Sequence, residues 1–221
     1  MQQVSLFVLA EQPSVANHFM AELRNYTRQT DRMRFRRNIE RLGGILAYEL
    51  SKALPYQPEL ITTPLGTTNI SLLEQQPVLV SILRAGIPLH LGVLDYFDEA
   101  DSGFIGAYRH HDATVPAGFT IRLDYQSIPS IQDRPLILID PMLASGQTLV
   151  KVLEQISKYG TPSQTHILSV IAAPEGVSLL EEKAQHPYHL WVGAIDEQLN
   201  DKSYIIPGLG DAGDLAFGNK L

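Results

Sequence analysis

The 221-residue sequence contains no cysteine, a single tryptophan and no long apolar run. Without cysteine, neither a disulfide framework nor a thiolate metal site can form. The apolar stretch at residues 4–10 is too short for a membrane span and lacks the basic flank of a secretory signal. We therefore expect a cytoplasmic protein with no membrane partner.

Positive charge is also scarce. The chain has 17 lysines and arginines against 24 acids, a formal net charge of −7, which argues against nucleic acid as a partner. An anionic substrate would need local arginines to overcome this unfavourable field. The content of 44% apolar and 19% charged residues is typical of a globular protein, and the length fits a single domain over residues 1–221.

Short apolar segments alternate with segments of helical periodicity, which predicts an α/β fold with a mostly parallel sheet flanked by helices. A long amphipathic helix is expected near the N-terminus, at residues 34–52. Residues 109–134 show poor periodicity and predict a long central loop or a β-hairpin arm. The expected strands are residues 78–82, 136–139, 167–173 and 189–195, and the further helices are residues 87–96, 149–159 and 177–184.

A phosphate-binding loop is predicted within residues 136–148, LILIDPMLASGQT. An apolar strand ends in Asp140 and continues through a small, hydroxyl-bearing loop, residues 144–148, into a helix. Helix N-termini offer unpaired N–H groups and the positive end of the dipole, so they bind phosphate readily. Asp140 could alternatively cap the following turn, but beside an anion site its carboxylate suits ribose hydroxyls or a metal ion. The first ligand class to consider is a sugar phosphate.

A second anion site is predicted at ILRAG, residues 82–86, where a buried strand ends in a cation. The planar donors of Arg84 match two phosphate oxygens, although an arginine here can also bridge carboxylates for structural reasons. Next to a phosphate loop, Arg84 favours a ligand with two separated phosphate groups. Arg109 could reach the same cleft or lie solvated on the surface.

The C-terminal sequence YIIPGLGDAGD, residues 204–214, literally matches the dinucleotide fingerprint GxGxxG at Gly208, Gly210 and Gly213. Only eight residues follow Gly213, too few for the βαβ unit that the fingerprint requires. The exposed backbone of this loop could instead read the polar edge of a small planar base. The alternative is an irregular tail with helix-capping acids.

Together these segments resemble the uracil phosphoribosyltransferase family. DPMLASGQT is similar to the family's loop for phosphoribosyl pyrophosphate (PRPP), ILRAG to its pyrophosphate-contacting loop, and residues 204–214 with Phe217 and Gly218 to its uracil-binding hood. Similarity continues through LRNYTRQTDRMRFRR, AAPEG and AIDEQLN, so it covers most of the chain. The resemblance implies a type I phosphoribosyltransferase core with a hood formed by the two ends of the chain. It also implies Mg²⁺-dependent transfer of ribose 5-phosphate from PRPP to uracil, giving UMP and pyrophosphate in pyrimidine salvage.

The resemblance assigns roles to individual residues. Asp140, Arg84 and Asp211 are expected to be catalytic, and Mg²⁺ to be held mainly by PRPP rather than by a protein cage. It further implies a homodimer or larger assembly, with GTP as an effector in some members. Uracil is expected to contact Ile205, Gly210, Asp211 and Ala212. The expected PRPP contacts are Arg84, Arg109, Asp140, Pro141, Met142, Leu143, Ala144, Ser145, Gly146, Gln147, Thr148 and Asp211.

The chain departs from the family pattern at two places, and several alternatives stay open. Gln147 places a bulky side chain where the family loop usually has glycine, and residues 110–134 diverge from the usual acids and prolines. Seven arginines between residues 24 and 41 form either a solvated helix face or a site for an anion such as an effector nucleotide. The other functions to consider are a nucleotide-binding regulator without turnover and a phosphoribosyltransferase for another base.

Overall fold

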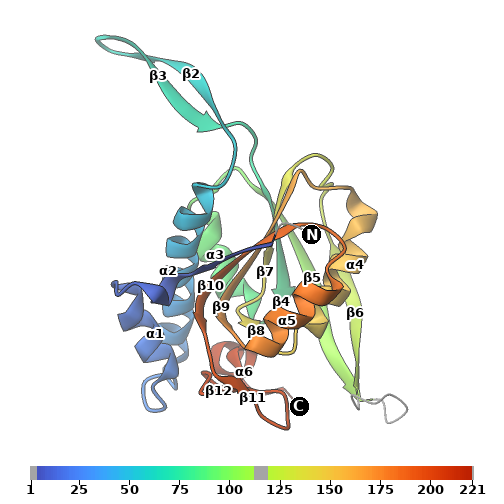
Figure 1. The fold of residues 1–221 in the computed structure, drawn as a ribbon. Helices are drawn as coiled ribbons and strands as arrows, with labels where there is room; N and C mark the ends of the chain where they lie inside the picture. Colours follow the sequence, from blue (N-terminus) through green and yellow to red (C-terminus); the bar gives the residue numbers. More distant parts are fainter. Residues whose placement is uncertain (1–3, 112–118, 221) are drawn as a thin grey trace.

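The computed structural model describes residues 4–111 and 119–220. Its centre is an eight-stranded sheet of order β1-β10-β9-β7-β4-β5-β6, with the short β8 beside β9 (Figure 1). Every pairing in this sheet is parallel except that of β5 with β6. The strands are Val4–Val8 (β1), Val78–Leu83 (β4), Asp101–His111 (β5), Phe119–Ser127 (β6), Pro135–Ile139 (β7), Met142–Leu143 (β8), Gln164–Ala172 (β9) and Tyr188–Ile195 (β10).

The central strands are buried on both faces, because their side chains alternate between two hydrophobic clusters. In β7, Ile137 and Ile139 join one cluster, whereas Leu136 and Leu138 join the other. Leu79 of β4 belongs to the first cluster and its neighbours to the second. Successive side chains of a strand point to opposite faces, so a continuous apolar run fits a sheet covered on both sides.

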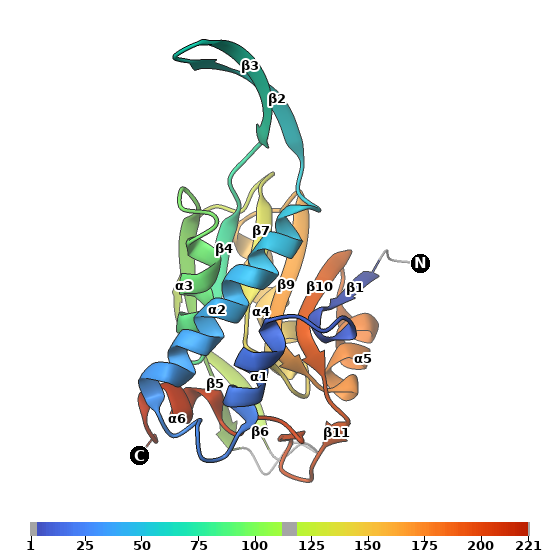
Figure 2. The same cartoon turned by 90° about the vertical axis from the view of Figure 1, so that its left-hand side faces the viewer.

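Helices cover both faces of the sheet (Figure 1). The N-terminal helices α1 and α2 pack with α3 against one face, and α4 and α5 lie on the other. Figure 2 shows α2 running along the first face beside α3. The helices are Ala16–Arg24 (α1), Arg32–Ser51 (α2), Gly86–Leu94 (α3), Gln147–Ile156 (α4), Pro174–Lys183 (α5) and Ala212–Phe217 (α6), with 3₁₀ turns at Leu9–Glu11 (η1) and Ser157–Tyr159 (η2).

The predicted α/β architecture is confirmed, and the expected strands and helices fall within a few residues of the observed ones. The N-terminal helix starts earlier than expected, at Arg32, because the Asp31 side chain accepts a hydrogen bond from the Arg34 N–H at 3.0 Å and caps it. The predicted helix over residues 149–159 also begins earlier and finishes in the 3₁₀ turn η2. In the central segment the hairpin alternative is correct, since β5 and β6 pair antiparallel.

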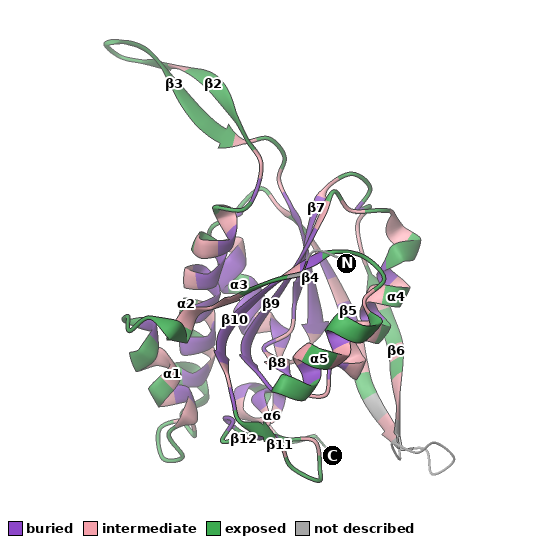
Figure 3. Cartoon of the chain, viewed as in Figure 1, coloured by how far each residue is buried: buried purple, intermediate pink, exposed green. Residues whose placement is uncertain are grey.

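A second hairpin, which the sequence analysis did not predict, projects away from the body of the protein (Figures 1 and 2). Its strands are Tyr56–Thr63 (β2) and Gly66–Leu73 (β3), paired antiparallel over their full length. Nearly all of its residues are exposed, including the apolar Leu60, Leu65 and Ile70 (Figure 3). We call this hairpin, residues 56–73, the β-arm.

The C-terminal segment lies across the carboxyl ends of the parallel strands. The short strands Gln198–Leu199 (β11) and Ile205–Ile206 (β12) form a separate antiparallel pair, and α6 follows. Ligands bind at this edge in open α/β sheets, because the loops that leave the strands converge there. Within the described residues no helix is long and apolar enough to cross a membrane.

Candidate active site

A cleft of about 710 Å³ lies at the carboxyl ends of β4, β5 and β7, beneath the C-terminal segment. This volume is in the usual range for small-molecule sites. Its walls come from the turn after β4, the β5–β6 hairpin, the loop after β7 and the C-terminal glycine loop. The lining residues are Ile82, Leu83, Arg84, Ala85, Gly106, Ala107, Tyr108, Asp124, Tyr125, Asp140, Met142, Ala144, Thr148, Ser203, Tyr204, Ile205, Gly210, Asp211, Ala212, Gly213 and Lys220.

The predicted phosphate loop leads directly into the N-terminus of α4. Gly146 precedes the helix with a φ of 78°, a left-handed conformation that glycine adopts at little cost. A Cβ at this position would lie 2.8 Å from the Gly176 carbonyl oxygen of α5, so a side chain does not fit. Gln147 is the first residue of α4 and is partly exposed. No side-chain hydrogen bond caps the helix at Gly146, so first-turn backbone N–H groups are left to bind an anion.

Asp140 stands at the tip of β7 on the floor of the cleft. One of its carboxylate oxygens accepts a hydrogen bond from the Met142 N–H at 3.2 Å, and its backbone carbonyl accepts one from the Ser169 hydroxyl at 2.6 Å. Desolvation raises the pKa of this carboxyl from 3.8 to about 7, and the Met142 hydrogen bond opposes the rise only in part. Hydroxyl donors from a ribose would favour the ionised form and so suit this position.

Arg84 enters the cleft from the turn after β4. Its guanidinium donates to a carboxylate oxygen of Asp214 at 3.0 Å and to the Gly218 carbonyl at 3.2 Å. These contacts join the turn after β4 to α6 and the C-terminal tail. The group is partly exposed, so it can exchange a carboxylate for the oxygens of a phosphate.

The C-terminal glycine loop turns its backbone toward the same cleft. Gly208 and Gly210 have φ values of 63° and 90°, which allow the chain to reverse sharply between β12 and α6. Asp211 caps α6 by accepting a hydrogen bond from the Asp214 N–H at 3.0 Å, and its other oxygen lies 3.8 Å from the Lys220 ammonium. Ile205 and Ala212 lie at the two ends of this loop.

The structure brings most of the predicted site residues together. Arg84, Asp140 and Asp211, all expected to be catalytic, line one cleft with Ile205, Gly210 and Ala212, the remaining expected uracil contacts. Of the predicted PRPP loop, Met142, Ala144 and Thr148 border the cleft. Pro141, Leu143 and Gly146 are buried behind it, while Ser145 and Gln147 are partly exposed at the helix start. Arg109 belongs to β5, but its side chain lies outside the described residues.

Several cleft residues had not been singled out from the sequence. Tyr108 and Asp124 face each other across the β5–β6 hairpin, with the tyrosine hydroxyl donating to the carboxylate at 2.7 Å. This contact raises the pKa of Tyr108. Gly106, Ala107, Tyr125, Ser203 and Lys220 also line the cleft without having been predicted. No local motif marks these residues, because only strand pairing and the path of the C-terminal tail bring them to the site.

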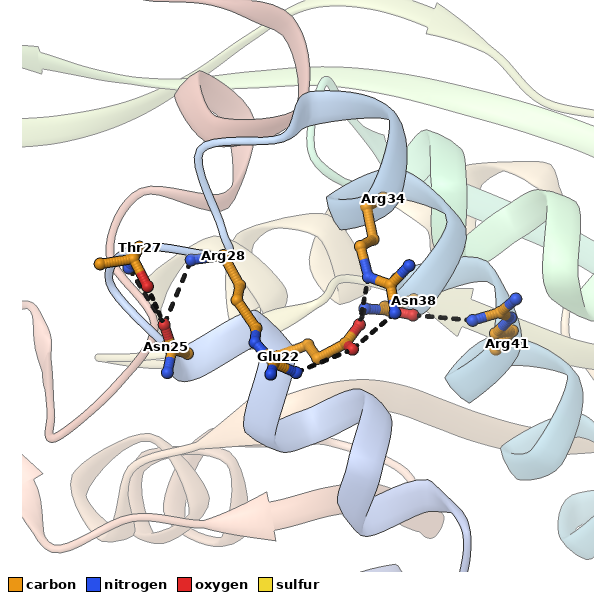
Figure 4. Close-up of polar contacts among 7 residues, drawn as sticks. All are labelled: Glu22, Asn25, Thr27, Arg28, Arg34, Asn38 and Arg41. Atoms are coloured by element: carbon orange, nitrogen blue, oxygen red, sulfur yellow. Dashed lines mark hydrogen bonds and ion pairs between the residues drawn. The ribbon is translucent and has the colours of Figure 1, made fainter.

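The N-terminal arginine cluster is largely engaged in contacts within the protein. Figure 4 shows Glu22 of α1 at the centre of a network, where it accepts from Arg28 and Arg34 and from the Asn38 amide. The hydrogen bonds from Arg34 and then Asn38 lower the pKa of Glu22 to about 2. Arg41 donates to Asn38 at 3.1 Å. This network ties α1 to α2, and its arginines Arg28 and Arg34 remain more than half exposed, as the alternative of a solvated helix face implies.

Comparison with known proteins decides the family. The uracil phosphoribosyltransferase family profile matches residues 10–219. The uracil phosphoribosyltransferase of Porphyromonas gingivalis is 43% identical over 213 residues, which cover 96% of this chain and 98% of that protein. The chain belongs to the uracil phosphoribosyltransferase family.

Two solved structures share the fold of this chain. The AQ2163 protein from Aquifex aeolicus superposes with a TM-score of 0.86 at 32% identity, covering 98% of this chain and 99% of that one. A hypoxanthine-guanine phosphoribosyltransferase from Bacillus anthracis has a TM-score of 0.50 at 13% identity, covering 73% of this chain and 81% of its own. This second likeness concerns the fold alone and fits a type I phosphoribosyltransferase core.

Proposed function

We propose that this member of the uracil phosphoribosyltransferase family transfers ribose 5-phosphate from PRPP to uracil, giving UMP and pyrophosphate in pyrimidine salvage. The bond from C1 of the ribose to a pyrophosphate oxygen breaks, and a bond from C1 to a ring nitrogen of uracil forms as that nitrogen releases its proton. The observation that carries the proposal is the convergence of Asp140, Arg84 and the loop around Gly210 on one cleft.

The 5-phosphate and the ribose of PRPP are each proposed to contact a group of suitable chemistry in this cleft. The N-terminus of α4 would receive the 5-phosphate, since its first-turn N–H groups and helix dipole favour an anion. Asp140, at the floor of the cleft, would accept hydrogen bonds from the ribose hydroxyls. These contacts fix the position of C1 between the base and the leaving group, and positioning of this kind contributes strongly to the rate.

The second contribution to the rate is stabilisation of the charge that develops on the leaving pyrophosphate. Breaking the C1–oxygen bond leaves an oxocarbenium-like sugar and a strongly anionic pyrophosphate. Arg84 is placed to donate to that anion once it gives up Asp214 and Gly218. Its planar guanidinium can hold two oxygens at once, so it stabilises charge as the charge develops. Arg109 is proposed to assist from β5.

The acidic residues of the cleft fit a requirement for Mg²⁺. Asp124, Asp140 and Asp211 all line it, and carboxylate oxygens are the protein ligands that Mg²⁺ prefers. Among the described residues no group of three or more acids and histidines is arranged as a metal cage. We propose, as the family resemblance implies, that PRPP itself would supply most of the ligands of Mg²⁺. When bound, the ion would neutralise the charge of the leaving pyrophosphate.

Uracil would be read by the backbone of the C-terminal glycine loop. Ile205, Gly210 and Ala212 border the cleft within this loop, where N–H and C=O groups can match the amide-like edge of the base. Asp211 belongs to the same loop and also lines the cleft. The positive φ values of Gly208 and Gly210 let the backbone of this loop turn sharply beside the cleft.

The direct test is UMP formation from uracil, PRPP and Mg²⁺, with cytosine, orotate and hypoxanthine as competing bases. We expect product with uracil and none without Mg²⁺. Product with hypoxanthine or orotate but not with uracil would show that the base loop reads another base. Binding of UMP without any turnover over a range of protein concentrations would instead support a regulator.

We also propose that the protein is a homodimer or larger assembly, and the β-arm supports this proposal. A two-stranded hairpin is only marginally stable alone in water, and this one leaves Leu60, Leu65 and Ile70 exposed. A second copy could cover these residues. Sedimentation of the double variant L60D/I70D should show a smaller species than the wild type if the arm is the interface, whereas an unchanged mass would exclude the arm.

The proposal also includes GTP as an effector and a cytoplasmic location. GTP is proposed as an effector on the family resemblance. Adding GTP to the UMP assay should raise the rate, and an unchanged rate at millimolar GTP would remove the effector from the proposal.

A cytoplasmic location is proposed because PRPP and UMP are highly charged and do not cross membranes unaided.

A further inference from the structure

We infer that Arg24 and Asp196 form a positioning pair that sets the backbone geometry of the uracil-binding loop. The inference rests on the proposed function, because it assigns to this pair an effect on uracil rather than on PRPP. Arg24 is the last residue of α1, and Asp196 follows directly after β10. Both lie outside the residues that line the cleft.

Both members of the pair form hydrogen bonds with one residue of the loop, Gly208. The guanidinium of Arg24 donates to both carboxylate oxygens of Asp196, at 2.7 and 2.5 Å, in a two-pronged arrangement. It also donates to the Gly208 carbonyl at 3.1 Å, while the Gly208 N–H donates to Asp196 at 2.8 Å. Because both backbone groups of Gly208 are engaged, the peptide planes on either side of it are fixed.

The backbone of the loop has little conformational freedom at Gly208. Its φ of 63° is in the left-handed region, and an added Cβ would lie 2.2 Å from the Ile205 carbonyl oxygen. A rotation of either peptide plane at Gly208 would therefore move Ile205 on one side and Gly210 on the other. These two residues are among those proposed to hold uracil, so the pair acts on the base through the backbone.

A second contact from the same N-terminal segment supports the assignment. The Gln29 amide donates to the Leu23 carbonyl at 2.8 Å and to the Leu209 carbonyl at 3.2 Å. Residues 24–29 thus hold two successive carbonyl groups of the loop. The N-terminal part of the chain orients the base loop, while the PRPP loop after β7 has no contact with Arg24 or Asp196 among the described hydrogen bonds.

The burial of Asp196 makes the pair dependent on arginine. Its side chain is 3% exposed, so loss of the guanidinium would leave a buried carboxylate without its partner. Lysine keeps the charge but lacks the planar fork, with donors on separate nitrogens, that spans both oxygens of Asp196. The variant R24K is therefore the informative one, and R24A serves as the more severe case.

The experiment compares R24K with R28K in the UMP assay. Arg28 is the matched control, because it belongs to the same segment and pairs with Glu22 on the surface without touching the loop. We expect R24K to raise KM for uracil about tenfold or more and to change KM for PRPP by less than about twofold. R28K should leave both constants within about twofold of the wild type.

Hydrogen exchange supplies a readout that does not need turnover. Amides in a peptide spanning residues 205–212 should exchange faster in R24K than in wild type and R28K, with unchanged exchange in residues 140–148. Equal exchange in the base loop, or KM values for uracil and PRPP that rise in parallel, would overturn the inference. If the wild type forms no UMP, the proposed function fails, and the exchange comparison still decides whether the pair sets the loop.

Discussion

Replacing Asp140 by asparagine should make the protein more stable at alkaline pH while abolishing its proposed activity. The pKa of this carboxyl rises from 3.8 to about 7 on folding because burial disfavours the charged form. Between these two values the folded state binds a proton that the unfolded state has lost. Stability contributed by this group therefore falls as pH rises through that window and stays low above pH 7. Asparagine does not titrate, so the free energy of unfolding of D140N lacks this loss at high pH.

The magnitude follows from the two pKa values. The full rise corresponds to about 4 kcal/mol, of which about 3 kcal/mol develops between pH 5 and pH 8.5. The difference between wild type and D140N in the free energy of unfolding should change by that amount between the two pH values. Comparing two pH values cancels the contributions to this difference that do not change with pH.

Urea unfolding at fixed protein concentration, with no Mg²⁺ or substrate, measures this difference at each pH. S169A is a suitable control, because it removes the hydroxyl that donates to the Asp140 carbonyl and adds no titrating group. Its stability difference from wild type should be the same at both pH values. If D140N also showed a constant difference, desolvation would not be controlling the Asp140 carboxyl and the reasoning would be refuted.

Two further predictions concern the anion sites. R84K should lower kcat/KM for PRPP more than tenfold, because lysine loses the fork that holds two phosphate oxygens, and an unchanged value would remove Arg84 from the pyrophosphate site. G146A should lower the free energy of unfolding by about 1–3 kcal/mol and raise KM for PRPP, since the added Cβ meets the Gly176 carbonyl at 2.8 Å in a left-handed backbone. G66A, whose Cβ would meet nothing within 4 Å, is the control in thermal unfolding, and equal losses in the two variants would contradict this account.

Much of the fold and of the candidate site can be read from local sequence. The apolar run before Asp140 predicts a strand buried on both faces, and its alternating contacts with the two core clusters confirm this. The strand-to-loop transitions at Arg84 and Asp140 predict site positions as well, because parallel strands bring their carboxyl ends to one edge. These features depend on side-chain periodicity and on turn residues, both of which are local properties of the chain.

The β-arm could not be predicted in the same way. Among the described residues of this arm, only Leu73 at the end of β3 packs against a core cluster, so no apolar face sets a clear alternation between buried and exposed positions. The central segment could be either a loop or a hairpin for a related reason, since pairing with β5 rather than local pattern makes Phe119–Ser127 a strand. Tertiary contacts decide such segments.

The sequence by itself determined the chemistry that each loop suits. Residues 136–148 suit phosphate and ribose, and the glycine loop at residues 204–214 suits a base. Tertiary structure decided that they face each other, because the C-terminal segment crosses the strand ends and Asp214 meets Arg84. It also decided how the base loop is held, through Arg24 and Asp196, which lie 172 residues apart in the chain. Contacts between distant segments depend on the path of the backbone, and no local pattern records that path.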